Sequence, residues 1–270
     1  RVPPPLALRW GRLLAEGTHV LLPAPDERHA LLLELRGFAL TAVRLVDPAT
    51  GAVTWIAADV GQVDFVGASH FLLADGGGWE LRHVDDGRVV ATGSEALVLP
   101  VGNSLVAWNE DGSRILTFPG GDELELPGFA IDTVAGGWGV LHAPEDGGHR
   151  LLLLEGESGG VLDVGVATTW YLDPGRGALA WVEADEAGDT WLAIRGPGQP
   201  ARRLAPVTSL DRLAWAADAA VVAWLADGEA FAHAFGGEVE ALGPASSTSL
   251  DVSPSGRFVR FSDGGQSKLR

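Results

Sequence analysis

The sequence predicts an all-β fold, and three observations support this prediction. Apolar runs are short and rich in Val, Leu, Trp and Phe, as in β-strands. No segment keeps the 3.6-residue apolar period of a helix over three turns. The 37 Gly and 16 Pro residues interrupt the apolar runs at close intervals, which tight turns between strands require.

A repeat of about 38 residues runs through the chain and sets its organisation. Ser104–Trp108, followed by the polar turn Asn109–Gly112, resembles Val221–Trp224, which is followed by a turn ending in Asp227 and Gly228. Equivalent runs centre on Leu33, Leu73, Trp108, His142, Trp181, Trp224 and Phe261. Seven units of this length use the whole chain.

Each unit is predicted to form four short antiparallel strands. In the third unit the predicted strands are Leu97–Pro100, Ser104–Trp108, Arg114–Phe118 and Glu123–Leu126. The segments between them contain Gly, Asn, Asp and Pro, the residues that tight hairpins favour. Repeated four-stranded units of this size favour a seven-bladed β-propeller, with a solenoid as the alternative.

The predicted blades follow one another without linkers in a single propeller domain. They cover residues 16–58, 62–93, 96–127, 131–165, 168–206, 211–243 and 248–270, with 5–15 added to the last. The last unit is long enough for three strands only, whereas an orphan strand precedes the first unit. We therefore expect residues 5–15 to complete the last blade and close the ring, which removes exposed sheet edges.

Two segments resemble the repeats of known propeller families. Leu250–Phe261 contains the turn Ser-Pro-Ser-Gly before a Phe-Val-Arg-Phe strand, and it resembles the bacterial WD-like repeat of TolB-like proteins. That family has Asp where this chain has Ser255. Val43–Trp55 is similar to the strand-turn-strand of quinoprotein-type propellers, but it occurs once. Both resemblances imply a propeller fold and, because propellers host unrelated activities, no particular function.

Composition excludes several classes of function. The formal net charge of −17 argues against nucleic acid or anionic lipid as the main partner. Without cysteine there are no disulfides and no thiolate chemistry. The sequence contains no run of 18 or more consecutive apolar residues, so no membrane-spanning helix is predicted. The opening Arg-Val-Pro-Pro-Pro and the absence of methionine suggest a processed or partial chain, which favours an exported or envelope location over the cytoplasm.

No local motif predicts a catalytic residue, a metal site or a cofactor. Gly156–Gly160 matches the G-x-S-x-G pattern of serine hydrolases, but the elbow in those enzymes leads into a helix, and here strands are predicted on both sides. The motif is therefore interpreted as a hairpin turn. The seven histidines contain no i, i+4 pair and no H-E-x-x-H motif, so no zinc site is predicted.

Carboxylates concentrate in the loops between second and third predicted strands. Those loops hold Asp75, Glu110, Asp111, Glu145, Asp146, Glu183, Asp185, Glu186, Asp189, Asp227, Glu229 and Asp263. Turn propensity explains Asp at such positions but not Glu. We therefore predict an acidic rim that binds a basic protein segment or cations, with a solvated surface as the alternative. Its proposed binding residues are Glu110, Asp111, Glu145, Asp146, Asp185, Glu186, Asp189, Asp227 and Glu229.

A second set of carboxylates is the basis for an alternative function, that of an enzyme-associated propeller. Four aspartates near the starts of blades could line a central channel: Asp64, Asp132, Asp211 and Asp251. They could equally cap backbone amides. The sequence favours a non-catalytic propeller that recognises a protein partner or a ligand. The alternative is an enzyme-associated propeller, either the gating domain of a peptidase or a hydrolase that uses the channel carboxylates.

Overall fold

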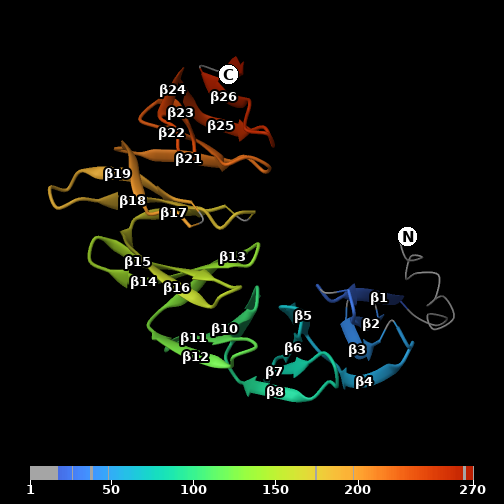
Figure 1. Ribbon diagram of the computed structural model, residues 1–270. Coiled ribbons are helices and arrows are strands. Elements are labelled where there is room, and N and C mark those ends of the chain that lie inside the picture. The colour runs from blue at the N-terminus through green and yellow to red at the C-terminus, as the bar shows by residue number, and fades with distance from the viewer. Residues whose placement is uncertain are drawn as a thin grey trace. The chain divides into compact units, whose positions relative to one another are not determined.

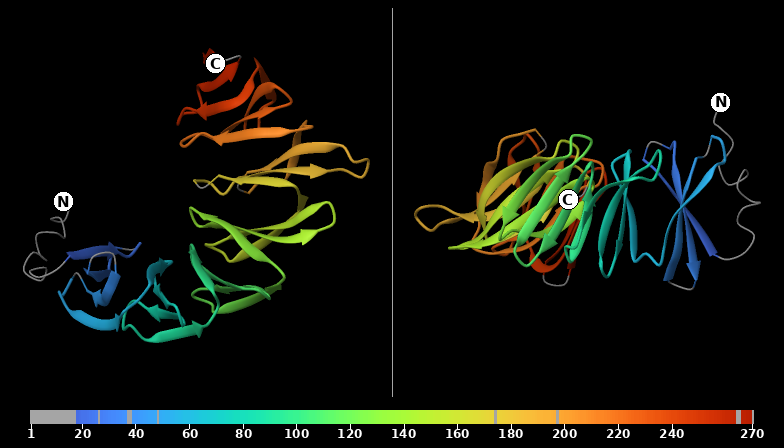
Figure 2. Two further views of the ribbon diagram at one scale, coloured as in Figure 1. Left: turned by 180° about the vertical axis from the view of Figure 1, so that it is seen from behind. Right: turned by 90° about the horizontal axis from the view of Figure 1, so that it is seen from below.

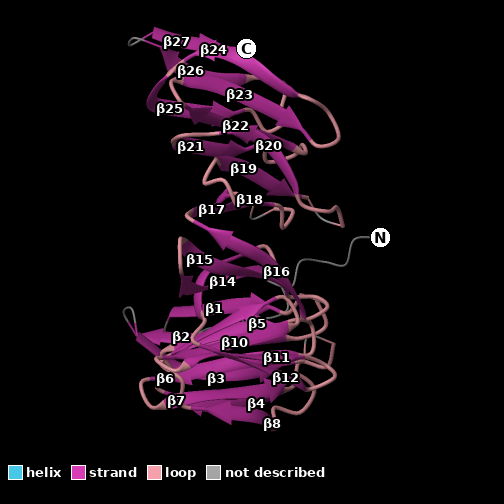
Figure 3. Ribbon diagram, turned by 90° about the vertical axis from the view of Figure 1, so that its left-hand side faces the viewer, coloured by secondary structure: helices cyan, strands magenta, loops and turns pink. Residues whose placement is uncertain are grey.

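The fold is known from a computed structural model, which describes residues 18–25, 27–36, 39–47, 49–173, 175–196, 198–263 and 266–269. These residues form strands and turns and no helix (Figure 3). Accordingly, no described helix is long and apolar enough to cross a membrane. The predicted all-β class is confirmed.

The described strands form seven antiparallel sheets, numbered 1 to 7 here in chain order (Figure 1). Six sheets have four strands and the seventh has three. Strands adjacent in sequence are adjacent in each sheet. Each sheet is thus one continuous stretch of chain, so the colour changes gradually from sheet to sheet (Figure 2). This up-and-down order is that of propeller blades, and the predicted fold class is confirmed at the level of its seven blades.

The chain divides into two compact units. The first unit contains sheets 1 to 3 and the turn Glu155–Gly160. Its strands are β1 Thr18–Pro23, β2 Ala30–Arg36, β3 Ala39–Val46, β4 Val53–Ala58, β5 Gln62–Val66, β6 His70–Asp75, β7 Gly78–His83, β8 Val89–Gly93, β9 Leu97–Val101, β10 Ser104–Asn109, β11 Gly112–Thr117 and β12 Asp122–Pro127.

The second unit contains sheets 4 to 7 apart from that turn. Its strands are β13 Ala130–Ala135, β14 Trp138–Glu145, β15 Gly148–Glu155, β16 Gly160–Ala167, β17 Thr169–Leu172, β18 Leu179–Ala184, β19 Thr190–Arg195, β20 Arg202–Pro206, β21 Leu210–Trp215, β22 Val221–Ala226, β23 Glu229–Ala234, β24 Val239–Pro244, β25 Ser246–Val252, β26 Val259–Asp263 and β27 Gln266–Leu269. The predicted closing strand at 5–15 lies outside the described residues.

Burial falls from the second strand of a sheet to its fourth, and the sequence explains why. The second strand of sheet 3, β10, reads Ser-Leu-Val-Ala-Trp-Asn, and its first four residues are buried. Such continuous apolar runs are typical of strands covered on both faces. The fourth strand, β12, reads Asp-Glu-Leu-Glu-Leu-Pro and is almost entirely exposed.

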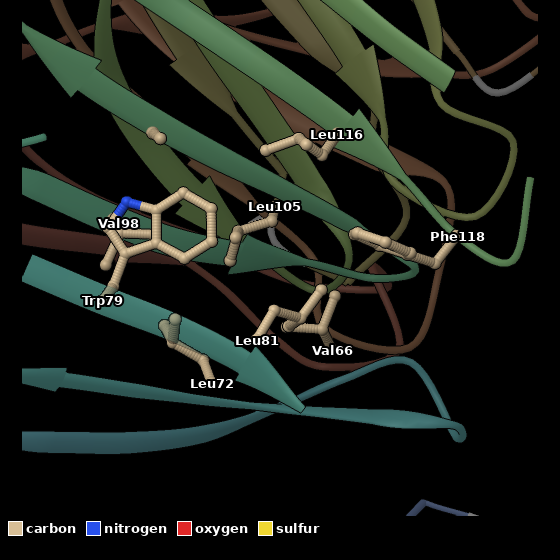
Figure 4. Close-up of a cluster of buried hydrophobic side chains, with 9 residues drawn as sticks. Val66, Leu72, Trp79, Leu81, Val98, Leu105, Leu116 and Phe118 are labelled. Carbon is tan, nitrogen blue, oxygen red and sulfur yellow. The ribbon is translucent and has the colours of Figure 1, made fainter. Parts of the chain in front are cut away.

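The hydrophobic core lies between the faces of neighbouring sheets within each unit. Between sheets 2 and 3, Leu72, Trp79 and Leu81 pack against Leu105 and Phe118 (Figure 4). Equivalent clusters join sheets 1 and 2, 4 and 5, 5 and 6, and 6 and 7. Tryptophans contribute to several of these clusters, which supports a packing role for them rather than exposed ligand stacking.

Candidate functional site: the acidic rim

The second-to-third-strand hairpins lie at the sheet end from which the chain continues to the next sheet. Second and fourth strands run in the same direction, so the hairpin after one lies beside the connection after the other. Backbone hydrogen bonds join the two: Gly128 N–H donates to Asp111 O at 2.8 Å, and Ala245 N–H to Gly228 O at 2.9 Å. We call this the hairpin end of each sheet.

The nine rim residues all lie at hairpin ends, in sheets 3 to 6. Glu110 and Asp111 lie in the β10–β11 turn. In the second unit the others lie on the three hairpins β14–β15, β18–β19 and β22–β23: Glu145, Asp146, Asp185, Glu186, Asp189, Asp227 and Glu229. All except the partly buried Asp185 are exposed.

Two rim residues build turns. The Asp227 carboxylate accepts hydrogen bonds from the backbone N–H groups of Thr208 and Ser209, both at 2.9 Å. Asp185 accepts from the N–H groups of Ala187 and Asp189, at 2.9 and 3.0 Å. Burial acts to raise the pKa of Asp185, but these donors and a bond from an indole N–H hold it below its ordinary value.

The remaining rim carboxylates differ in whether a cation neutralises them. Glu145 lies 3.7 Å from a guanidinium nitrogen of Arg150. Six of the nine rim carboxylates accept no hydrogen bond and form no ion pair with the described part of the chain: Glu110, Asp111, Asp146, Glu186, Asp189 and Glu229. Their charge is therefore available to a partner.

A cavity of about 460 Å³ lies beside the sheet 3 hairpin, next to the connection from sheet 2. Four carboxylates line it, those of Glu95, Asp111, Glu123 and Glu125, against one cation, Arg114. Asp111 thus joins the rim to this cavity. A lining with this charge balance favours a cationic ligand.

Arg114 is held in place by two of these carboxylates. Its guanidinium lies 2.6 Å from Glu95 and 3.2 Å from Glu123, and 5.6 Å from the ring centre of Trp79. The indole N–H of Trp79 donates to Glu95 at 2.8 Å. Burial acts to raise the pKa of Glu95, but hydrogen bonds from its own backbone N–H and the Trp79 indole, together with Arg114, hold it below its ordinary value. No spacing in the sequence links these residues, so the cluster could not be predicted from the sequence.

The four channel candidates all lie on first strands, but the structure gives them different partners. Asp132 on β13 accepts from the indole N–H of Trp170 at 2.9 Å. Asp251 on β25 accepts from Arg260 Nε at 3.1 Å. Asp64 on β5 lies 3.5 Å from the Gln62 amide, and Asp211 on β21 is exposed without a described partner. Among the described residues, no three or more His, Asp or Glu side chains are placed to hold a metal ion.

The G-x-S-x-G segment forms the β15–β16 turn, as predicted from its flanking strands. Ser158 Oγ donates to Glu155 at 2.7 Å and accepts from the N–H of Gly160 at 3.0 Å. The hydroxyl thus bridges the two ends of the turn.

No protein-family model and no curated protein matches this sequence. Solved structures with a similar arrangement of strands include propeller domains. The β-propeller domain of the Trilobed protease from Pyrococcus furiosus is 12% identical, with 85% of this chain and 84% of that chain covered and a TM-score of 0.37. For the Cps50 (Swd1) β-propeller domain of Myceliophteria thermophila the identity is 12%, the coverage 95% and 98%, and the TM-score 0.35. Acylaminoacyl peptidase of Pyrococcus horikoshii is 11% identical over 93% of this chain and 49% of its own, with a TM-score of 0.36. Likeness at this level does not carry a function from those proteins to this one.

Proposed function

We propose that this chain is a non-catalytic propeller module that binds a Lys/Arg-rich segment of a partner protein through its acidic rim. The observation that carries the proposal is the set of six exposed rim carboxylates without a described partner. Within either compact unit, an extended basic segment would place cations opposite such carboxylates, and electrostatic attraction would speed its association. The TolB-like resemblance of Leu250–Phe261 adds a further proposal, an origin in a bacterial exported or envelope protein.

The test compares two variants of equal charge. The rim variant removes four unpaired rim charges by Glu110→Gln, Asp111→Asn, Glu186→Gln and Asp189→Asn. The control variant removes four exposed charges towards the opposite sheet ends by Asp122→Asn, Glu157→Gln, Glu238→Gln and Glu240→Gln. The affinity of a fluorescein-labelled peptide of alternating Lys and Ser is measured by fluorescence anisotropy.

The rim variant is expected to bind the peptide at least about tenfold more weakly than the unmodified chain, since each exposed pair contributes up to ~1 kcal/mol. The control variant is expected to lose much less. Equal losses in the two variants would show that net charge, rather than the rim, attracts the peptide. Binding should also weaken between about 0.05 and about 0.3 M salt, because salt screens exposed charges.

The alternative is an enzyme-associated propeller that uses Asp64, Asp132, Asp211 and Asp251. It predicts that a hydrolytic activity, once found, is lost in Asp211→Ala and Asp251→Ala. The separate partners of Asp132 and Asp251 give this alternative less support than the rim has.

A further inference from the structure

Two histidines of sheet 4 face each other through the same ring nitrogen. His142 lies on β14 and His149 on β15, and their Nδ1 atoms are 3.1 Å apart. The two rings are 5.0 Å apart between centres and inclined at 60°. At this distance one Nδ1 must carry a proton and the other must accept it.

A tryptophan of the neighbouring sheet covers the pair. The ring of Trp170, on β17 of sheet 5, lies 5.5 Å from the ring centre of His142 and 5.6 Å from that of His149. Its indole N–H donates to Asp132 on β13 at 2.9 Å. The pair therefore lies at a contact between sheets 4 and 5, within the second unit.

The charged groups around the pair come from all four strands of sheet 4. Asp132 on β13 attracts a proton to His142. Arg150, next to His149 on β15, is held by Glu145 at the end of β14 and by Asp163 on β16. From sheet 5, Trp170 presents an uncharged ring. Asp132 is thus the carboxylate that acts most directly on the pair.

We propose that His142 and His149 share a single proton between their Nδ1 atoms and that the rings separate when both become positively charged. This makes the sheet 4–sheet 5 contact sensitive to acid. When one ring is charged, its Nδ1–H donates to the neutral partner, and this charge-assisted bond is strong. When both rings are charged, two N–H donors face each other at a distance suited to one bond, and like charges repel. The two protons are therefore taken up in two separate steps that belong to the pair.

The direction of the His142 pKa agrees with this geometry. Burial lowers the pKa of His142, the charge of His149 lowers it further, and Asp132 acts in the opposite direction. The second protonation is consequently displaced to lower pH, and the pair opens below the range where an isolated histidine titrates.

The experiment follows the two histidine rings and Trp170 in the full chain, with EDTA present to remove metal ions. Histidine ring resonances are recorded by 15N NMR from pH 8 to pH 4, and Trp170 is followed by 19F NMR after fluorotryptophan labelling. Assignments come from His142→Gln, His149→Gln and Trp170→Phe. We expect His142 and His149 to titrate together in two steps, with the Trp170 resonance moving at the second.

The variants separate coupling from misfolding. In either histidine variant the remaining ring is expected to titrate in one step, and the acid transition of Trp170 to disappear. Asp132→Asn keeps an acceptor for the indole N–H, removes the charge, and is expected to lower the midpoint of the second step. His19→Gln, in the first unit, should leave the Trp170 transition unchanged.

Three results would overturn the proposal. One is independent single-step titration of both rings in the unmodified chain. Another is a Trp170 transition that persists in both histidine variants. The third is a transition seen without EDTA and absent with it, which would make the pair a metal site.

Discussion

His70 on β6 is a buried ionisable residue whose surroundings favour its neutral form. It is 5% exposed, its Nδ1 lies 2.9 Å from Ser69 Oγ, and its ring lies on that of Phe118. Burial, with smaller contributions from the charges of His83 and Arg88, lowers the pKa of His70 to about 4. Between about pH 6.5 and pH 4, His70 therefore binds a proton in the unfolded chain but stays mostly neutral in the folded chain.

This difference predicts how stability depends on pH. The pKa of His70 in the folded chain lies below the ordinary value of 6.5. Its contribution to the free energy of unfolding is therefore complete above about pH 6.5 and is lost as the pH falls towards 4. The loss amounts to about 3 kcal/mol of unfolding free energy. His70→Gln is expected to flatten this part of the stability curve, measured by urea unfolding at several pH values. An unchanged slope would show that His70 takes up its proton in the folded state without penalty.

Asp227 illustrates a rim residue with a structural task. Its carboxylate holds two backbone N–H groups of the sheet 5 to sheet 6 connection, and its own φ is +52°. Asp227→Ala is expected to reduce the unfolding free energy by about 1–2 kcal/mol, since it loses both hydrogen bonds and disfavours that backbone conformation. Asp227→Asn keeps one acceptor and tolerates positive φ, so its loss should be smaller. Equal urea midpoints for the two variants would contradict this role.

At the scale of elements, hairpins were the most predictable feature. All four strands predicted for sheet 3 are present, because each is bounded by turn residues that act locally. The third strand begins at Gly112 rather than Arg114. Gly112 adopts φ +144°, which favours glycine, and pairs with Asn109, so the hairpin is tighter than the sequence suggested.

The partners of several polar side chains could not be predicted, because they come from residues distant in sequence or depend on ring orientation. Asp227 is capped by donors 18 and 19 residues before it. Glu95 meets an indole N–H 16 residues earlier. His142 and His149 are only seven residues apart, yet their pairing depends on ring orientations that no motif encodes.

The first turn of sheet 3 offers a test of close packing between elements. At Gly102, φ is +58°, and an added Cβ would lie 2.8 Å from the carbonyl carbon of Gly156. Gly121 has φ +72° with open space around it. Gly102→Ala should therefore reduce the unfolding free energy by about 1–3 kcal/mol more than Gly121→Ala, which bears only the backbone penalty. Similar losses in urea unfolding would show that the turn moves aside.

At the scale of the whole molecule, one pattern recurs in both compact units. In each of the six four-stranded sheets the second strand is more buried than the fourth, and neighbouring sheets within a unit share an apolar core. The repeat of about 38 residues encodes this pattern, which is why the sheets could be predicted from sequence alone. The net charge of −17 is distributed over this scaffold unevenly, with nine acidic residues at the hairpin ends of four sheets.

A map of backbone amide shifts, recorded as the Lys-Ser peptide is added to the 15N-labelled chain, shows directly whether the acidic rim binds a basic segment. Binding at the rim predicts the largest shifts at the hairpin ends, in residues 109–112, 145–148, 184–190 and 226–229. It predicts small shifts at the opposite ends, in residues 118–122, 155–160 and 234–238. Shifts of equal size at both ends, or none at the hairpins, would contradict a binding role for the acidic rim.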